Sequence, residues 1–468
     1  MQVPIINGVY MTPAADLRIS YPVNMTPVAE QTGVSNGYLR LAEGIRTFGA
    51  SVGPDRGAIV WNGECYRVSG QKLIKVLEDG DIEILGDVAG SDSEPVRFTY
   101  SFDRLAIASG GRLWYYFGGT LYQVVDPDIG DVLDVAWIDG YFMTTDGEFL
   151  VVTELNDPFA VNPLKYGSAE ADPDPVEAIL RLRNEIYAVN RNTIEVFSNT
   201  GGEGFPFAPV RGAQIQRGAV GPKAACVFAE RIALLGSARN EQPSIYIAEG
   251  AQTTKISTRE IDKLLSEYSE LDLSKVVLEG IERDGHQHLY IHLPDRTAVY
   301  DLLASQQLGQ PVWFYLTSTD AGFAQYTARY FVWCFNKWIC GDPSDVWRFG
   351  YLSPDSGTHW GIKVRWEFQT GIVYNEGRGA IFGEMELFAL VRPESVGDRP
   401  MISTCYSLDG MTWSQPRTIS AGTIGSNKRI VWFNNGMMRD VRIQRFFGDA
   451  ESRIAFARLD IDLQPLEY

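Results

Sequence analysis

The chain has 468 residues, of which 45% are hydrophobic, 12% aromatic and 21% charged, as in ordinary folded proteins. This length allows two to four domains, or one large repeat domain with an appendage. The formal net charge of −18 argues against tight binding to duplex DNA or to an anionic membrane surface, because both need clustered Lys and Arg.

The charge is unevenly distributed, since residues 359–468 contain 13 basic and 13 acidic residues and all eighteen net negative charges therefore lie before residue 359. The five cysteines have no CxxC spacing, and we expect mostly reduced, buried thiols: Cys65, Cys226, Cys334, Cys340 and Cys405. The first residues lack a secretory signal, and no run of about 18 apolar residues occurs. We therefore expect synthesis and folding in a cytoplasm, without a membrane anchor.

The first 50 residues contain few hydrophobic runs and are predicted to form an extended N-terminal arm with a short paired segment. This arm supplies a strand either to a neighbouring subunit or to its own domain. Further along, the Pro- and Asp-rich stretch 156–175 is predicted to be an exposed loop.

A repeated pattern occupies residues 51–357, in which an apolar stretch meets a small polar turn and a second apolar stretch follows. The turns recur at intervals of 36 to 54 residues and are anchored at Asn62, Asp103, Asp139, Asn184, Glu230, Asp284 and Asn336. Asn-Gly and Asp-Gly turns between β-branched and aromatic flanks are typical of β-hairpins. A four-stranded propeller blade takes about 40–50 residues. The pattern predicts an all-β fold with a β-propeller of six or seven blades; the alternative is an array of β-sandwiches or an irregular β-solenoid.

One helix is predicted to interrupt this pattern at about residues 258–270. Ser257 and Glu260 have the spacing of a capping box, and Ile261, Leu264, Leu265 and Tyr268 form one apolar face. We expect this helix to pack against the outside of a blade.

Residues 358–468 lack the blade rhythm and contain longer strands, which predict a separate C-terminal β domain similar to a β-sandwich. In the last strand Ile454 and Phe456 have one parity, whereas Leu459, Ile461 and Leu463 have the other. A β-bulge near Arg458 would reconcile the two sets.

Three of the four histidines lie close together, at His286, His288 and His292. Alternate residues of a strand face the same side, so these imidazoles would be able to converge on a transition metal. However, no downstream carboxylate is spaced to complete or orient the site. We therefore expect surface and interface histidines and no metal site.

Two other motifs are partial matches. The segment Asp126–Asp131 resembles a calcium loop but has the wrong register and no final Glu, which favours a solvated turn between blades. The segment Ser407–Trp413 resembles the Asp-box turn of sialidases, which is a folding motif and not a catalytic one. The sequence also contains no GxSxG elbow, HExxH helix or phosphate-binding Gly loop. We therefore predict no enzyme activity and assign no catalytic, cofactor-binding or metal-binding residue and no cofactor.

The chain resembles the packaged-DNA stabilisation proteins of short-tailed bacteriophages, also called tail hub or nozzle proteins. The resemblance covers about three quarters of the chain, in segments that occur in matching order: Tyr21–Met25, Ser35–Ile45, Cys65–Val76, Gly86–Asp92, Pro243–Ser269, His288–Trp313 and Cys340–Val346.

This resemblance implies a structural virion protein, assembled in the host cytoplasm as a homo-oligomer, a hexameric ring in the family, below the portal and its adaptor. Such a ring extends the DNA channel, helps to retain packaged DNA and provides attachment for the tail needle and for tail fibres or spikes. DNA would pass through the lumen without specific binding.

Two alternatives remain. The aromatic richness and the Asp-box-like turn favour a glycan-binding or glycan-degrading tail propeller. A bacterial propeller scaffold is the other alternative.

Overall fold

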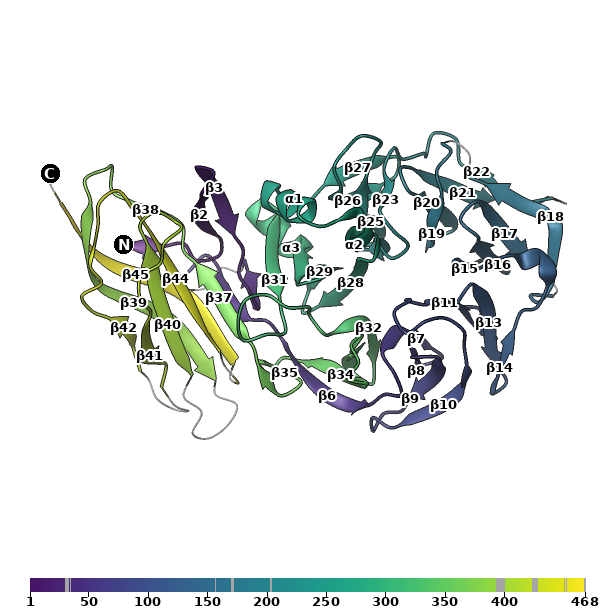
Figure 1. Cartoon of the computed structure of the whole chain (residues 1–468), viewed down its shortest axis with the longest axis horizontal. Coiled ribbons are helices and arrows are strands. Elements are labelled where there is room, and N and C mark those ends of the chain that lie inside the picture. Colours follow the sequence, from purple (N-terminus) through teal and green to yellow (C-terminus); the bar gives the residue numbers. More distant parts are fainter. Residues whose placement is uncertain are drawn as a thin grey trace.

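A computed structural model describes residues 1–29, 33, 35–155, 157–169, 172–202, 204–392, 400–422, 428–449, 451 and 453–466. These residues form a ring of β-sheets and a two-sheet sandwich that lies against one side of the ring (Figure 1). The predicted combination of a propeller and a C-terminal sandwich is therefore confirmed.

Seven sheets, or blades, make up the described ring, and the main strands of each are antiparallel. Blade 1 contains β7 (Asp55–Trp61), β8 (Glu64–Ser69), β9 (Lys72–Val76) and β10 (Ile82–Asp87); blade 2 contains β11 (Arg97–Tyr100), β12 (Leu105–Ser109), β13 (Arg112–Phe117) and β14 (Thr120–Gln123); blade 3 contains β15 (Asp134–Ile138), β16 (Tyr141–Thr145), β17 (Phe149–Thr153) and β18 (Val161–Ser168); blade 4 contains β19 (Val176–Leu182), β20 (Glu185–Asn190), β21 (Ile194–Asn199) and β22 (Phe207–Pro209). Blade 5 contains β23 (Gly218–Ala219), β24 (Ala225–Phe228), β25 (Arg231–Ser237), β26 (Ser244–Glu249) and β27 (Gln252–Lys255), and blade 6 contains β28 (Val277–Arg283), β29 (His286–His292), β30 (Thr297–Asp301) and β31 (Val312–Leu316).

Blade 7 joins the two ends of the propeller. It consists of β32 (Arg329–Cys334), β33 (Lys337–Gly341), β34 (Arg348–Ser353) and, on its outside, β6 (Gly44–Ala50) from the N-terminal part of the chain. The short strands β35 (Thr358–His359) and β36 (Ile362–Lys363) extend this sheet. The innermost strand of every blade contacts that of the next, and β32 contacts β7, so the ring is closed.

Six of the seven predicted turn anchors lie between the first and second strands of their blades, and Glu230 lies in the corresponding hairpin of blade 5, between β24 and β25. Asn62, Asp139, Asp284 and Asn336 have positive φ angles of 50 to 55° there, a conformation that Asn and Asp adopt more readily than most residues. The repeat seen in the sequence therefore marked one hairpin in each blade.

The sandwich packs two sheets face to face. The first contains β4 (Met25–Val28), β5 (Tyr38–Leu41), β45 (Arg453–Pro465), β39 (Ala380–Arg392) and β42 (Ile430–Trp432), with β1 (Gln2–Val3) on β45 and β43 (Met437–Met438) on β39; the second contains β37 (Arg365–Gln369), β44 (Val441–Asp449), β40 (Met401–Ser407) and β41 (Arg417–Ser420), with β38 (Val373–Tyr374) on β44. Trp366, Phe368, Phe446 and Phe456 stack in the core between the sheets. The register of β45 against β39 skips Ala457, so the bulge predicted near Arg458 is present.

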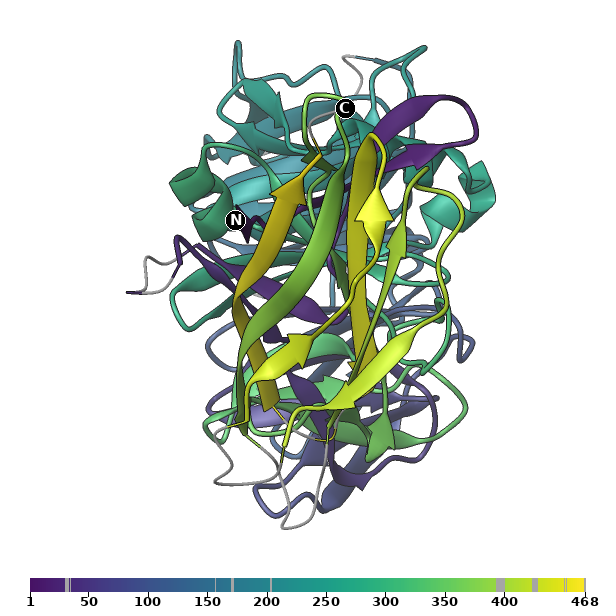
Figure 2. The same ribbon diagram turned by 90° about the vertical axis from the view of Figure 1, so that its left-hand side faces the viewer.

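The first 50 residues are shared between the two bodies. Strands β1, β4 and β5 belong to the sandwich, β6 completes blade 7, and the hairpin of β2 (Gly8–Thr12) and β3 (Asp16–Ser20) projects beside them. Seen from the sandwich end, the first and last parts of the chain occupy the same body (Figure 2). The described part of the N-terminal segment thus pairs within its own chain.

Two expectations about local structure were wrong. The stretch 156–175 contains β18, the outermost strand of blade 3, where Pro163 is tolerated because an edge strand leaves backbone groups unpaired. The predicted helix is α1 (Arg259–Ser266), but Thr258 and not Ser257 is its N-cap, since the Ser257 hydroxyl donates to Asp262 instead. The apolar face of α1 is buried as predicted.

Two further helices were not predicted. They are α2 (Glu270–Ser274), which follows α1 directly, and α3 (Leu302–Leu308), which connects β30 to β31. No helix in the described part of the chain is both long and apolar enough to cross a bilayer.

Candidate functional surfaces and a buried histidine cluster

The axis of the propeller is crossed by side chains near one face. Arg97 of blade 2 donates to the Pro222 carbonyl at the start of blade 5, and Lys223 donates back to the Val96 carbonyl. Blades 2 and 5 lie across the ring from each other, with blades 3 and 4 on one side and blades 6, 7 and 1 on the other. Burial lowers the pKa of Lys223 well below its usual range. The chain itself therefore closes the axis of its propeller near this face.

The opposite face of the ring has an open hollow of about 670 Å³ over blades 1 to 4. Its aromatic side chains include Phe102, which is 91% exposed and contacts Trp137 edge-on at 5.5 Å between ring centroids. The Arg181 guanidinium stacks over the same Trp137 ring at 5.3 Å. An apolar, cationic and solvent-exposed surface of this kind is typical of contacts with another protein.

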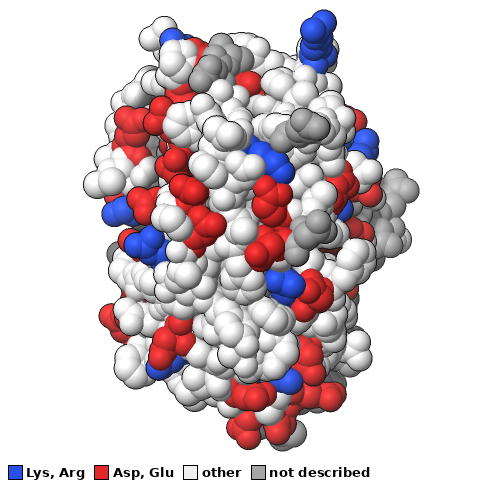
Figure 3. All heavy atoms as spheres, turned by 90° about the vertical axis from the view of Figure 1, so that its right-hand side faces the viewer, with Lys and Arg blue, Asp and Glu red and all other residues white. Residues whose placement is uncertain are grey.

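The end of the molecule farthest from the sandwich is strongly acidic. Acidic side chains far outnumber basic ones over this face (Figure 3). Residues 113–180, which run from blade 2 through blade 3 into blade 4, contain 13 Asp or Glu and one Lys, a net charge of −12 out of −18. The exposed acidic side chains of residues 113–180, here called the acidic rim, include Asp128, Asp131, Asp146, Glu148 and Asp157.

The clustered histidines are buried, which contradicts the expectation of surface positions. His286 and His288 are each 7% exposed and His292 is 1% exposed. His292 contacts Thr297 and Glu279, whereas His286 and His288 converge on the carboxylate of Asp301. Asp301 was not predicted as a partner of these histidines, because it lies on the next strand, where strand register places it opposite His288. One signal was available: an Asp directly before LLASQQL is typical of a helix N-cap.

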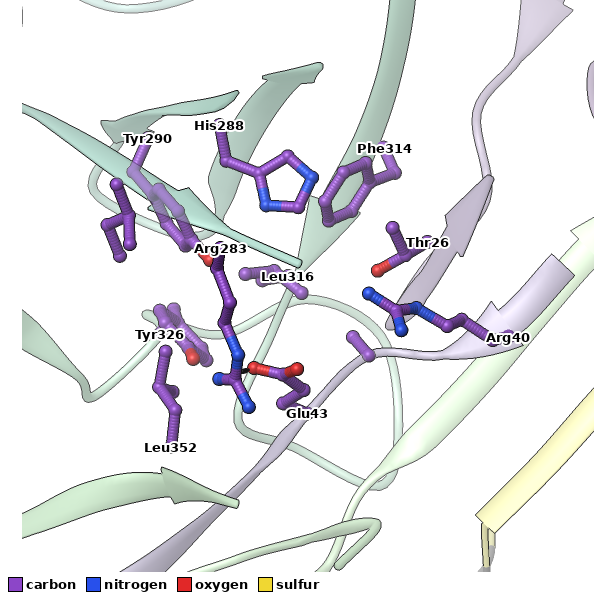
Figure 4. A pocket seen from close by; sticks show the side chains of 12 residues that line it. Thr26, Arg40, Glu43, Arg283, His288, Tyr290, Phe314, Leu316, Tyr326 and Leu352 are labelled. Carbon is purple, nitrogen blue, oxygen red and sulfur yellow. Dashed lines mark ion pairs between the residues drawn. The ribbon is translucent and has the colours of Figure 1, made fainter. Parts of the chain in front are cut away.

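A small cavity of about 20 Å³ adjoins His288, between blade 6 and the N-terminal segment. Figure 4 shows His288, Tyr290 and Phe314 on one side of it and Arg40, Glu43 and Arg283 on the other. Glu43 forms an ion pair with Arg283, and Arg40 forms one with Asp284. The cavity has room for about one water molecule and not for an organic substrate.

The two partial motifs are local turns. Asp126 caps the short 3₁₀-helix η1 (Pro127–Ile129) in the connection between blades 2 and 3. Asp409 accepts hydrogen bonds from the Met411 and Thr412 backbone and from the Thr412 hydroxyl, which hold its pKa well below the usual range. This Asp-box-like turn connects β40 to β41 in the sandwich, away from the propeller. The five cysteines are all free, and Cys226 alone of them is only partly buried.

Comparisons with solved structures give only weak likeness. The WD40 domain of Neurospora crassa Pan2 aligns with a TM-score of 0.43 and 10% identity, over 66% of this chain and 96% of that one. The N-terminal domain of Nup159 aligns with a TM-score of 0.41 and 7% identity, over 70% of this chain and 97% of that one. These values carry no functional argument.

Comparisons of sequence are informative. The tail hub protein gp10 of Salmonella phage P22 is 28% identical over an alignment of 446 residues, which covers 89% of this chain and 89% of that protein. The family model described as Bacteriophage P22 Gp10, beta-propeller, matches residues 1–357, and that described as Bacteriophage P22 Gp10, beta-sandwich, matches residues 365–464. The chain belongs to the P22 Gp10 family, with the propeller and the sandwich of that family both present.

Proposed function

We propose that this protein is a structural tail hub of a short-tailed phage virion and has no catalytic role. The observation that carries the proposal is the family match along both bodies of the chain, which includes a relative described as a tail hub protein. The absence of a substrate-sized pocket beside the buried cluster of titratable side chains agrees with this role, since the cavity there has a volume of only about 20 Å³.

In this proposal the subunits close into a ring, six in number, below the portal and adaptor, and the ring extends the DNA channel. Ring formation fits the blocked axis of the single propeller, because the lumen then lies between subunits. Heterologous contacts between identical subunits close into rings when the rotation between neighbours completes a circle. The needle and the tail fibres or spikes would attach to the same ring.

The acidity supplies a mechanism for DNA passage. Six copies carry a formal charge of −108, and any acidic surface that faces the lumen repels phosphate groups over about 8–10 Å at physiological salt. The DNA would therefore slide without adhering, and obstruction below it rather than affinity would retain it.

The test is to mix the purified full chain with portal–adaptor complexes of its own phage and to image the product by electron microscopy. A ring that caps the adaptor is expected. Persistently unbound monomer, with the adaptor complex intact, would contradict the proposal. A polysaccharide hydrolysis assay on the same preparation distinguishes the glycan-degrading alternative, for which turnover is expected.

A further inference from the structure

Three potential metal ligands converge on one face of blade 6. His286 and His288 lie two residues apart on β29, and Asp301 ends the neighbouring strand β30, paired with His288. Oδ2 of Asp301 lies 2.6 Å from Nδ1 of His286 and 3.2 Å from Nε2 of His288. The three ligand atoms are all within 4.8 Å of one another, and all three residues are buried.

The carboxylate of Asp301 is buried, and its only ion-pair partners among the described residues are His286 and His288. Its side chain is 0% exposed, and among the described residues no Lys or Arg lies within ion-pair distance of it. The nearby cations are already paired, Arg40 with Asp284 and Arg283 with Glu43. A nearby cation stabilises a buried carboxylate, so this position suits a bound metal ion.

The ligand atoms are also held in place. Oδ1 of Asp301 accepts a hydrogen bond of 3.0 Å from the Ala304 backbone at the start of α3, which leaves Oδ2 facing the imidazoles. The Phe314 ring packs edge-on against His288 at 5.6 Å (Figure 4). Such outer contacts orient ligands in metal sites.

We propose that His286, His288 and Asp301 bind one divalent transition-metal ion of the zinc class, through Nδ1, Nε2 and Oδ2 respectively. Imidazole and carboxylate suit Zn²⁺, Co²⁺ and Ni²⁺. Three protein ligands leave one tetrahedral position for a water molecule.

Metal binding replaces the hydrogen bonds between the two imidazoles and Asp301 with bonds from the imidazoles to the ion. In the metal-free protein the two facing nitrogens donate hydrogen bonds to Asp301; on binding, each proton moves to the other nitrogen of its ring, and the freed lone pair coordinates the ion. The ion would then tie β29 to β30 and to the start of α3. Asp284, in the turn that precedes β29, pairs with Arg40 of β5 in the sandwich, so the site lies close to where the two bodies meet.

The first experiment uses the full chain, stripped with a chelator and then titrated with Co²⁺. We expect one equivalent per chain, with the visible absorption of tetrahedral Co²⁺ and an increase in Tm. Elemental analysis after Zn²⁺ loading and dialysis should also give one equivalent. A wild-type chain that takes up no stoichiometric metal would overturn the proposal, whatever the variants do.

The variants locate the ion. His288→Gln should lose the Co²⁺ band, and Asp301→Asn, which keeps an acceptor for the Ala304 amide, should weaken binding. His292→Gln is the matched control, because His292 is a buried histidine of the same strand that does not contact Asp301. Metal binding that is unchanged in both His288→Gln and Asp301→Asn would place the ion elsewhere and overturn the proposal.

Discussion

The buried side chain of Asn24 forms hydrogen bonds to both the propeller and the sandwich. Asn24 is 1% exposed; its amide donates to the carbonyls of Thr317 and Arg365 at 2.9 and 2.7 Å, and its side-chain oxygen accepts from the Thr317 backbone at 3.0 Å. Thr317 follows β31 of blade 6, and Arg365 begins β37 of the sandwich. The backbone of Asn24 has a φ angle of 51°, which Asn tolerates better than most residues.

Asn24→Ala should lower the free energy of unfolding by about 3 kcal/mol, because three buried backbone groups lose their partner. Asn24→Gly is the matched variant, since it loses the same hydrogen bonds but accepts a positive φ without strain. We expect the glycine variant to be the more stable of the two by about 1 kcal/mol in urea denaturation. Equal stability of both variants and the wild type would contradict this role for Asn24.

A buried histidine should make the protein sensitive to acid. Burial lowers the pKa of His359 to about 3, and its ring contacts Ser318 and Tyr326 but no charged group among the described residues. The unfolded chain binds a proton near pH 6.5 and the folded chain does not, so stability falls as the pH falls from 6.5 toward 3. The slope for one such group is about 1.4 kcal/mol per pH unit.

His359→Gln should therefore reduce the dependence of Tm on pH between 4 and 6.5. As a reference, the wild type and the variant are also compared at pH 7.5. At that pH His359 is neutral in both the folded and the unfolded chain, so its titration does not contribute to the free energy of unfolding. An unchanged slope in the variant would contradict the assignment.

At the scale of elements, β6 closes the propeller. The antiparallel pairing of β6 with β34 joins residues 44–50 to the last blade. The buried side chain of Ile45 packs into the core between blades 6 and 7. Parting β6 from β34 would expose one edge of blade 7 and that core.

A chain that lacks residues 1–50 should therefore fail to fold as a monomer, and not merely fail to form rings. Near-ultraviolet circular dichroism and size-exclusion chromatography measure this directly. Replacing only the β2–β3 hairpin, residues 8–20, with a short Gly-Ser linker is the control, because that hairpin pairs with itself and leaves β6 in place. A soluble, native-like monomer without residues 1–50 would contradict the closing role of β6.

At the scale of the whole molecule, the acidic rim gives a test of the charge mechanism. If this end faces the lumen, replacing Asp128, Asp131 and Asp146 with Lys should slow DNA ejection and make it more dependent on salt, because Lys attracts phosphate groups. Release of DNA from assembled virions, followed by dye fluorescence at several ionic strengths, is the measurement.

The control for this set replaces three exposed acids of the sandwich, Glu376, Asp440 and Asp449, with Lys. Both sets change the net charge of the chain by the same amount, but the control set places the added Lys residues on the sandwich instead of on the acidic rim. An equal effect of both sets, or no effect of either, would contradict a lumenal position for the acidic rim.

The sequence by itself determined the all-β class, the propeller and the place of one hairpin turn in each blade, because turns such as those at Asn62 and Asp139 are local backbone requirements that the chain has to encode in place. It also located the bulge near Arg458, since strand parity is a local property. What the tertiary structure alone decided depends on contacts between distant residues: β6 in blade 7, β18 in a stretch rich in Pro, and Asp301 opposite His288. Strand pairing and burial depend on which separate segments meet and in which register. The local pattern of one segment does not specify its partner segment.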